Sequence, residues 1–168
     1  MKSKIKTINK SRLFFVLLSI VFMIIIFMFS SENGDDSKNT SGIITEFVVE
    51  NIVDDFNDLP EIDKIDILDT ISHIVRKTAH FSIYTALGFC VSCAAGRRKF
   101  LSKNSIYSLI ICFAYACSDE IHQYFVPERS CQFTDVLIDT SGALTGIVIS
   151  FAVMFVFFKI KKAKRLEP

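Results

Sequence analysis

Four apolar runs separated by polar segments dominate the hydrophobic pattern along the chain. They occupy residues 13–30, 78–96, 105–126 and 136–158. Each run has or approaches the roughly 20 helical residues needed to cross a hydrocarbon core of about 30 Å. Only helices satisfy their own backbone hydrogen bonds in lipid without closing a barrel. The pattern therefore predicts an all-α integral membrane bundle of four transmembrane helices, forming a single domain over residues 1–168.

A long polar segment, residues 31–77, separates the first two apolar runs. Its first part, up to residue 40, is rich in Ser, Asn, Asp and Gly and predicts a linker. Apolar residues at helical spacing follow over residues 44–56, and Leu59-Pro60 should end that helix because proline disfavours helix in the residue before it. A second amphipathic stretch, residues 65–75, can continue directly into the second membrane helix. We expect these amphipathic helices to form either a lid over the bundle or a purely structural cap.

The charged residues are strongly segregated, although 19 basic and 18 acidic residues nearly cancel to a net charge of +1. Basic residues cluster before the first apolar run, between the second and third, and after the fourth, whereas residues 30–75 are strongly acidic. Positive charge beside membrane helices favours the cytoplasmic side. We therefore expect a multi-pass protein of the cell membrane, with both termini cytoplasmic and with the acidic loop and residues 124–134 outside. The first run is longer than the apolar core of a signal peptide, so we expect it to remain as a helix. The basic segments are short topology flanks, so we expect no nucleic-acid binding.

Ionisable residues also occur within three of the apolar runs or at their ends, where they are costly and commonly functional. These polar residues are Arg76, Lys77, His80 and Tyr84, then Asp119, Glu120, His122 and Gln123, and finally Arg129, Asp135 and Asp139. At about 1.5 Å per helical residue, counted from the inner helix ends, all three groups fall in the outer third of the membrane. Because consecutive helices run in opposite directions, this convergence does not follow from one charged stretch. The sequence therefore predicts a polar site at the outer face.

Two small residues follow the last acidic residue of this group. Gly142 and Gly146 form a small-xxx-small pair, which allows two helices to pack closely. We expect that contact to bring Asp139 near its neighbours on the other helices. The predicted site has more acids than bases, a surplus that carboxyl protonation, a protonated His80 or a bound cation would offset. The alternative to a binding or catalytic site is a buried ion-pair network that only fixes helix register.

Four short motifs carry a resemblance to a known family. They are Arg76-Lys77-Thr78-Ala79-His80-Phe81, Ser118-Asp119-Glu120-Ile121-His122-Gln123, Pro127-x-Arg129-Ser130, and Asp135-Val136-x-x-Asp139-x-x-Gly142. In their order and spacing, they resemble the VanZ-like family over essentially the whole chain. The resemblance implies an envelope membrane protein associated with lowered susceptibility to the lipoglycopeptide teicoplanin. Glu128 stands where the family pattern usually has glycine, so Glu128 is strained if that turn needs a positive φ.

The leading functional hypothesis is binding of an amphipathic envelope ligand at the outer-face site. Candidates are a membrane lipid, a lipoglycopeptide or a lipid-linked wall precursor. Lys77 and Arg129 would hold a phosphate or carboxylate, and arginine is suited to bidentate contact. Asp119, Glu120 and Gln123 would orient the bases and the ligand. The predicted ligand-binding residues are Lys77, Tyr84, Gln123, Arg129, Asp135 and Asp139.

The alternative is a membrane-embedded enzyme acting on a lipid-linked or cell-wall substrate. Glu120 or Asp119 would then act as general base and His80 as general acid. A divalent cation held by Asp119, Glu120, Asp135 and His80 would be compatible with this chemistry, but the spacing matches no metal motif. No GxSxG, HExxH or P-loop pattern is present. A proton-coupled transporter is a third hypothesis, and the sequence assigns neither a cofactor nor an oligomeric state.

Overall fold

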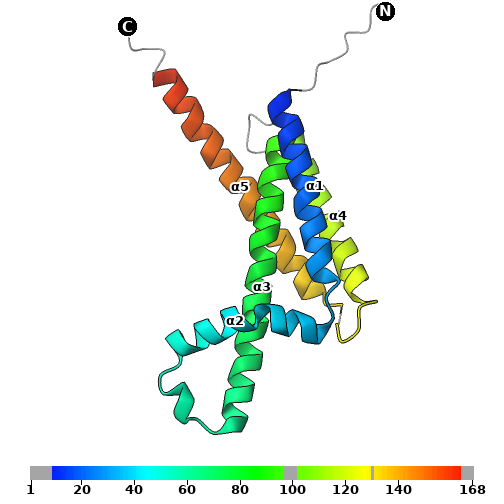
Figure 1. Cartoon of the computed structure of the whole chain (residues 1–168). Coiled ribbons are helices and arrows are strands. Elements are labelled where there is room, and N and C mark those ends of the chain that lie inside the picture. The colour runs from blue at the N-terminus through cyan, green and yellow to red at the C-terminus, as the bar shows by residue number, and fades with distance from the viewer. Residues whose placement is uncertain (1–8, 97–101, 130, 164–168) are drawn as a thin grey trace, which may run out of the picture.

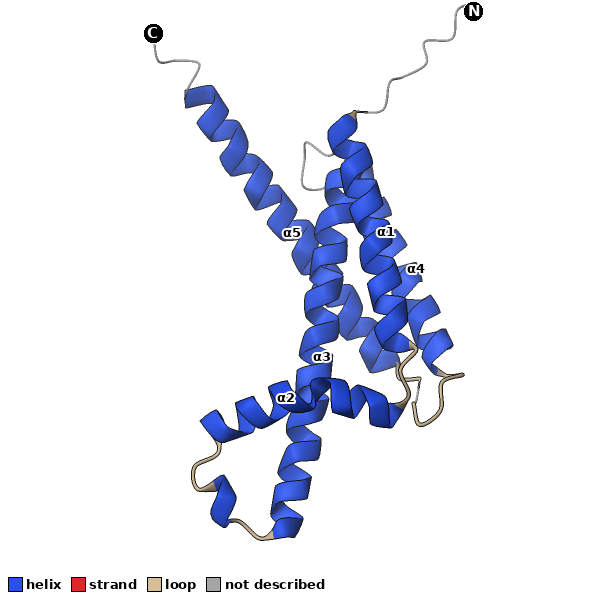
Figure 2. Ribbon diagram, in the orientation of Figure 1, coloured by secondary structure: helices blue, strands red, loops and turns tan. Residues whose placement is uncertain are grey.

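The computed structural model describes residues 9–96, 102–129 and 131–163, which form five α-helices and one short 3-10 helix, with no strand. The elements are α1 (Lys10–Ser30), α2 (Gly34–Ile52), η1 (Phe56–Asp58), α3 (Glu61–Ala94), α4 (Lys103–Gln123) and α5 (Phe133–Ala163), as Figures 1 and 2 show. The prediction of an all-α protein is confirmed.

Helix α3 is the centre of the structure and contacts each of the other four α-helices. Its most extensive contact is with α5, and α4 closes the bundle against α5 and α1. The start of α1 and the end of α5 lie at the same end of the bundle, while the chain between α1 and α3 lies at the opposite end (Figure 1). The basic segments used to predict orientation fall largely on residues 1–8, 97–101 and 164–168, outside the described residues.

The predicted continuation of the second amphipathic stretch into the helix of the second apolar run is confirmed, because α3 runs without a break from Glu61 to Ala94. At about 1.5 Å per residue, its 34 residues extend well beyond the bundle. Helix α2 crosses α3 steeply at the point where α3 leaves the bundle (Figure 2). A hydrogen bond of 3.3 Å between Ser41 Oγ and Ser72 Oγ links the two helices.

The predicted boundaries of α2 are wrong at both ends. Residues 34–40 are helical rather than a linker, because the Asn33 side chain caps the helix by accepting a 2.7 Å hydrogen bond from the Asp36 N–H. The helix then ends at Ile52 and does not reach Leu59. Asp55, with a φ of 55°, stands between it and the 3-10 turn that contains Phe56. A residue with a left-handed backbone conformation cannot continue a right-handed helix.

The predicted close packing at Gly142 and Gly146 is confirmed in the contact between α3 and α5. A Cβ atom at Gly142 would lie 2.4 Å from the carbonyl oxygen of Phe81, and one at Gly146 would lie 1.9 Å from that of Thr85. Thr85 Oγ1 also donates a 3.0 Å hydrogen bond to the Gly142 carbonyl. Only glycine permits this backbone approach, which fixes α5 against the middle of α3.

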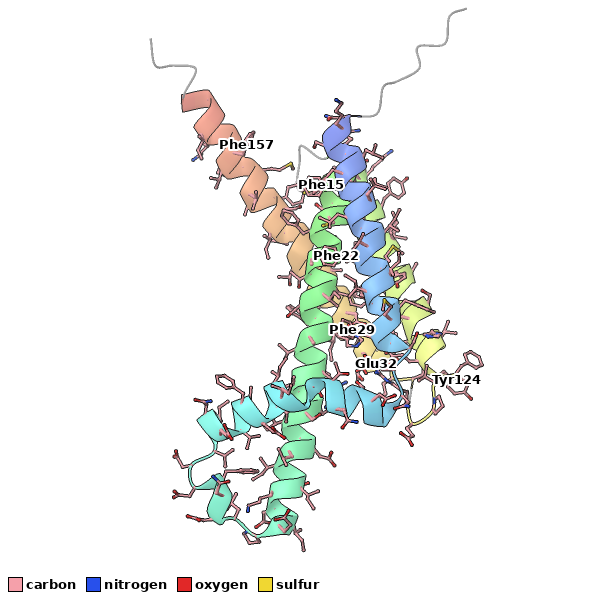
Figure 3. The ribbon with its side chains drawn as sticks, viewed as in Figure 1. Phe15, Phe22, Phe29, Glu32, Tyr124 and Phe157 are labelled. Atoms are coloured by element: carbon pink, nitrogen blue, oxygen red, sulfur yellow. The ribbon has the colours of Figure 1, made fainter. Side chains whose placement is uncertain are left out.

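Two of the helices are long and apolar enough to cross a membrane. They are α1 and the part of α5 from Phe133 to Phe157. Only 17% and 28%, respectively, of their most apolar 18-residue stretches are buried within the described chain. Phe15 and Phe22, for example, lie along α1 toward Phe29 (Figure 3). Within the described residues, α3 and α4 do not meet the same length and hydropathy test. Such exposed apolar helices suggest a membrane protein.

Candidate functional site

The predicted polar residues gather at the end of the bundle nearest α2. Phe29 and Glu32 at the end of α1 and Tyr124 just after α4 mark this end (Figure 3). Helices α3, α4 and α5 bring His80, Asp119 and Asp139 to it from three separate parts of the chain. The convergence estimated from helix lengths is therefore present among these residues.

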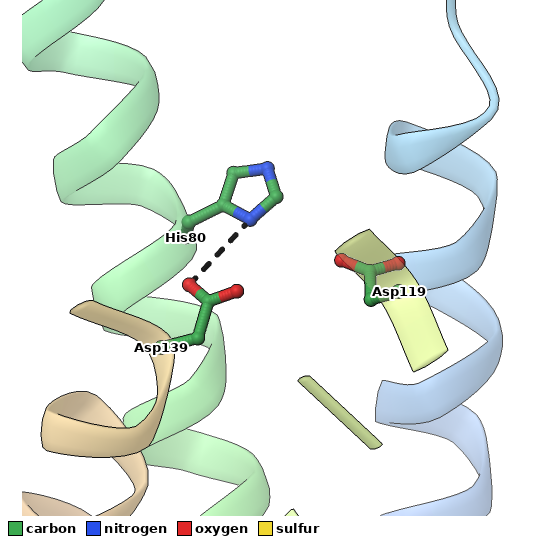
Figure 4. A group of neighbouring side chains, drawn as sticks. All are labelled: His80, Asp119 and Asp139. Carbon is green, nitrogen blue, oxygen red and sulfur yellow. Dashed lines mark ion pairs between the residues drawn. The ribbon is translucent and has the colours of Figure 1, made fainter. Parts of the chain in front are cut away.

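His80, Asp119 and Asp139 form a compact trio (Figure 4). His80 Nδ1 lies 3.7 Å from Asp139 Oδ1. One possible ligand atom from each side chain lies within 4.8 Å of the other two. Asp119 and Asp139 are only 3% and 1% exposed. The trio depends on the glycine contact, because Gly142 lies less than one helical turn after Asp139 and packs on Phe81, next to His80.

The end of α1 holds the Asp119 carboxylate in place. Ser30 Oγ donates a 2.9 Å hydrogen bond to Asp119 Oδ2, and Gln123 Nε2 donates to the same oxygen at 3.3 Å. Gln123 Nε2 also lies 3.3 Å from Ser30 Oγ. Ser30 is fully buried, yet it was not among the predicted site residues. Its signals in the sequence are a serine where an apolar run ends and the Ser30-Ser31 stretch that belongs to the family resemblance.

Arg129 is tied to the same end of α1. Its side chain donates to the carbonyl oxygens of Phe29 at 3.1 Å and Glu32 at 3.0 Å, and to Gln123 Oε1 at 3.4 Å. These contacts link Arg129 to the backbone at and just after the end of α1. Burial and then the positive charge of the nearby Arg76 lower the pKa of Arg129. The guanidinium remains charged, and the negative charges of Glu32, Asp119 and Glu120 oppose the effect of Arg76.

The turn that carries Arg129 contains the strain expected from the sequence. Glu128 has a φ of 62°, in the left-handed region where glycine is favoured. Gly34 packs directly against it, since a Cβ atom at Gly34 would lie 2.9 Å from the Glu128 carbonyl oxygen. The turn therefore joins the loop after α4 to the start of α2.

Four other predicted residues take positions outside the trio. Lys77 forms an ion pair with Asp135. Glu120 is 2% exposed, and its Oε2 accepts a 2.9 Å hydrogen bond from the backbone N–H of Gln132. Neither Glu120 nor Asp135 belongs to the trio, although a cation held by both together with His80 and Asp119 was compatible with the enzyme hypothesis. Tyr84 is fully buried, one helical turn from His80.

Two adjoining cavities open onto this region. The polar cavity, about 180 Å³, is lined by His73, Arg76, Lys77, His80, Glu120, Gln123, Glu128, Arg129, Gln132, Asp135, Ile138 and Asp139. The apolar cavity, about 250 Å³ with a mostly apolar surface, is lined by Ile26, Phe29, Glu32, Ser37, Thr40, Ser41, Ile44, Val75, Arg76, Ala79, His80, Ile83 and Arg129. Arg76, His80 and Arg129 belong to both cavities. Arg76 was recognised in the sequence as part of the polar cluster but was not included among the predicted ligand-binding residues.

Several buried polar atoms of the site have no hydrogen-bond partner in the part of the chain that the structure describes. They are Arg76 Nε, the Tyr84 hydroxyl, Asp119 Oδ1 and both carboxylate oxygens of Asp139. Buried polar atoms are normally satisfied, and each exception calls for an explanation. The arrangement offers one unpaired donor, Arg76 Nε, and acceptors without a hydrogen bond in the trio, so it can receive an anion and a cation at neighbouring points.

Comparison with known proteins supports the resemblance. The family model described as VanZ/LLP1 matches residues 15–158, which include α1 from its second turn and nearly all of α5. Searches of curated proteins and of solved structures gave no match. The match covers all four motifs and every residue of the trio. The chain therefore belongs to the VanZ/LLP1 family.

Proposed function

We propose that the protein is a multi-pass envelope membrane protein that binds an anionic amphipathic molecule at its outer face. The observation that carries this proposal is the pair of adjoining cavities, one polar and one mostly apolar, that share Arg76, His80 and Arg129. An amphipathic molecule needs this combination, because its head group and its hydrocarbon part require opposite surroundings. Small-molecule sites commonly combine an apolar lining with a few convergent polar groups.

In the proposed topology, α1, α3, α4 and α5 cross the membrane and both termini are cytoplasmic. The common end of α1 and α5 (Figure 1) supports this arrangement, as does the basic character of residues 1–12 and 159–165. Helix α2 and the first turns of α3 then lie at the outer surface. The trio and both cavities lie beside them, where molecules of the outer leaflet and the cell wall are encountered.

Arg76 and Arg129 are the proposed contacts for the anionic group. Arg76 Nε is buried without a partner, and the two guanidinium groups repel each other. A phosphate or carboxylate between them would remove that repulsion and supply bidentate, charge-assisted hydrogen bonds. Lys77 is already paired with Asp135, so its role is to complete the positive rim of the cavity.

The hydrocarbon part of the ligand would lie in the apolar cavity between α1, α2 and α3. Ile26 and Phe29 of α1, Ile44 of α2 and Ile83 of α3 contribute its apolar walls. Helix α2 forms one side of this cavity, which gives the outer segment the role of a side wall. Lowered susceptibility to teicoplanin, implied by the family resemblance, would follow if the bound molecule is the lipoglycopeptide itself or a lipid-linked wall precursor.

The binding proposal is tested on the purified full chain in uncharged detergent, with dodecyl phosphate as probe and an uncharged dodecyl amphiphile as reference. We expect dodecyl phosphate to bind more tightly, and Arg76→Ala to weaken its binding about tenfold, the equivalent of about 1.4 kcal/mol. Lys103→Ala removes an exposed basic residue at the far end of the bundle and should leave the affinity unchanged. Equal binding of both amphiphiles, or equal affinities of the two variants, would refute the proposal.

The phenotype is tested in a susceptible Gram-positive host. Cells that express the wild type, Arg76→Ala, Glu120→Gln or Lys103→Ala at matched membrane levels are exposed to teicoplanin and to vancomycin. We expect the wild type and Lys103→Ala to protect against teicoplanin, and the two site variants to lose protection. Absence of protection by the wild type would remove the resistance role and leave the amphiphile-binding result to stand separately.

An acid–base enzyme of the membrane is a second candidate, favoured by the His80–Asp139 pair beside Asp119. In this reading His80 is the general acid and Asp119 the general base. Conversion of an added lipid phosphate by the purified chain would support the enzyme. Unchanged substrate during binding at saturation would exclude it for that substrate.

A further inference from the structure

We propose that His80, Asp119 and Asp139 bind a divalent metal ion, with Zn²⁺ as the preferred ion. Each residue comes from a different helix, and one ligand atom from each lies within 4.8 Å of the other two (Figure 4). The proposed metal ligands need no amphiphile, although His80 also lines both cavities beside Arg76 and Arg129. Glu120 and Asp135 are not among these ligands, because they have other partners.

The spacing of the trio is close to that of a metal site. Zn²⁺ binds imidazole nitrogen and carboxylate oxygen at about 2.0–2.2 Å, so two tetrahedral ligands are about 3.4 Å apart. His80 Nδ1 and Asp139 Oδ1 are 3.7 Å apart, already near that value. The widest separation in the trio is no more than 4.8 Å, so small side-chain rotations are enough to close the site.

The unpaired oxygens of the trio point to a cation independently of its composition. Asp139 is 1% exposed. Its Oδ1 has only the 3.7 Å ion-pair contact with His80 Nδ1, and its Oδ2 has no hydrogen-bond partner among the described residues. Asp119 is 3% exposed and its Oδ1 is likewise unpaired. A buried carboxylate oxygen without a partner is costly, whereas a metal ion would bind these oxygens directly. Two carboxylates and a neutral imidazole also match the charge of a divalent ion.

The surroundings of Asp119 resemble those of a metal ligand held in place by its neighbours. Ser30 and Gln123 both donate to Oδ2 and leave Oδ1 as the free atom. Hydrogen bonds of this kind orient metal-binding carboxylates, and their loss typically weakens metal affinity by about 10–100-fold. Ser30 and Gln123 are therefore positioning residues for the proposed metal.

Access to the metal is provided by the polar cavity, because His80 and Asp139 form part of its lining. Three protein ligands leave a fourth position for water or a ligand group on that side. The mixture of imidazole and carboxylate suits Zn²⁺ and also accommodates Mn²⁺, but it disfavours ions that select thiolate ligands. No cysteine belongs to the trio.

The test measures metal binding by the purified full chain in detergent, without any added lipid. After chelator treatment and dialysis, Zn²⁺ is titrated calorimetrically, and bound metal is counted by mass spectrometry. We expect a single tight Zn²⁺ per chain, and an affinity at least about tenfold lower for His80→Gln, Asp119→Asn and Asp139→Asn. Asp66→Asn, which removes an exposed aspartate of α3, should bind Zn²⁺ like the wild type.

Substitution with Co²⁺ provides a spectroscopic readout of the same ligands. The wild type should show visible absorption from nitrogen and oxygen coordination, and each trio variant should alter or lose it. Ser30→Ala keeps all three ligands, so it tests the site even if a trio variant misfolds. We expect this variant to reduce Zn²⁺ affinity about tenfold. Absence of tight Zn²⁺ binding by the wild type, or binding that survives the trio substitutions but falls in Asp66→Asn, would overturn the proposal.

Because the titration uses metal alone, its failure would leave the dodecyl phosphate result untouched. Conversely, Arg76→Ala should retain the Zn²⁺ affinity of the wild type even where amphiphile binding is lost. Loss of both ligands in Arg76→Ala would contradict the assignment of separate anion and metal positions.

Discussion

Replacing Gly146 by alanine should separate α3 from α5 and destabilise the bundle. The added Cβ would lie 1.9 Å from the Thr85 carbonyl oxygen and 2.7 Å from the Phe89 nitrogen. Ordinary van der Waals contact begins at 3.4 Å, so the two backbones would have to move apart by about 1.5 Å, taking 3.4 minus 1.9. Both obstructing atoms belong to backbone, so a side-chain rotation cannot relieve the contact.

The expected cost can be estimated from the packing around this position. Overpacking in a close interface costs about 1–3 kcal/mol, and weakening the hydrogen bond from Thr85 Oγ1 to the Gly142 carbonyl adds about 1 kcal/mol. Replacing a helical glycine by alanine stabilises the helix by about 1 kcal/mol. The net loss should therefore be about 1–3 kcal/mol, as the second and third contributions cancel.

The assay compares unfolding of the purified wild type, Gly146→Ala and Gly42→Ala in the same detergent by circular dichroism. Gly42 is the matched control, because it also lies in a helix and an added Cβ would meet nothing within 4 Å. We expect Gly42→Ala to equal or exceed the wild type by up to about 1 kcal/mol. If Gly146→Ala were as stable as Gly42→Ala, the close approach of α3 and α5 would be refuted.

Three further predictions concern the loop after α4 and the proposed topology. Glu128→Gly should stabilise the chain by about 1 kcal/mol, since glycine adopts the 62° φ of this position without the penalty of a side chain; an unchanged or lower unfolding midpoint would contradict this. Partial desolvation and the negative charges of Glu120 and Asp135 raise the pKa of the Cys131 thiol. Alkylation of Cys131 should thus be slower than that of free cysteine at neutral pH and accelerate only at higher pH, with the profile of Glu120→Gln shifted to lower pH; coincident profiles would show that the carboxylate has no effect. In intact cells, a membrane-impermeant maleimide should label wild-type Cys131, whereas the double variant Cys131→Ser/Lys162→Cys should react only after lysis; labelling of that variant in intact cells would overturn the proposed topology.

The sequence was sufficient to predict an all-α bundle and the meeting of His80, Asp119 and Asp139. An α-helix rises by a fixed distance per residue. The heights of residues on antiparallel helices can therefore be compared before the packing of the helices is known. The contact of Gly142 and Gly146 with α3 was predictable for a similar reason, because small residues one turn apart identify a close helix face. The number of membrane crossings remains a prediction for α3 and α4, whose polar residues dilute their hydropathy.

Other parts of the site could not be read from the pattern. The start of α2 was missed because its first residues are polar and resemble a linker. The helix begins there because the Asn33 side chain caps it, and this cap depends on one hydrogen bond. Ser30 was missed because its role arises only when α1 packs beside α4. The sharing of Arg76 between two cavities likewise depends on the crossing of α2 over α3, which no periodicity encodes.

The unbroken course of α3 has a mechanical consequence for the site. Between Glu61 and Leu87, this helix contains neither proline nor glycine, the usual causes of a sharp kink. It therefore acts as a stiff lever, with its outer arm among the acidic residues and its inner arm in the bundle. A force applied to the first turns of α3 would tilt Arg76 and His80 together rather than bend the chain between them. Opening of the anion position and distortion of the metal ligands would then be two effects of a single movement.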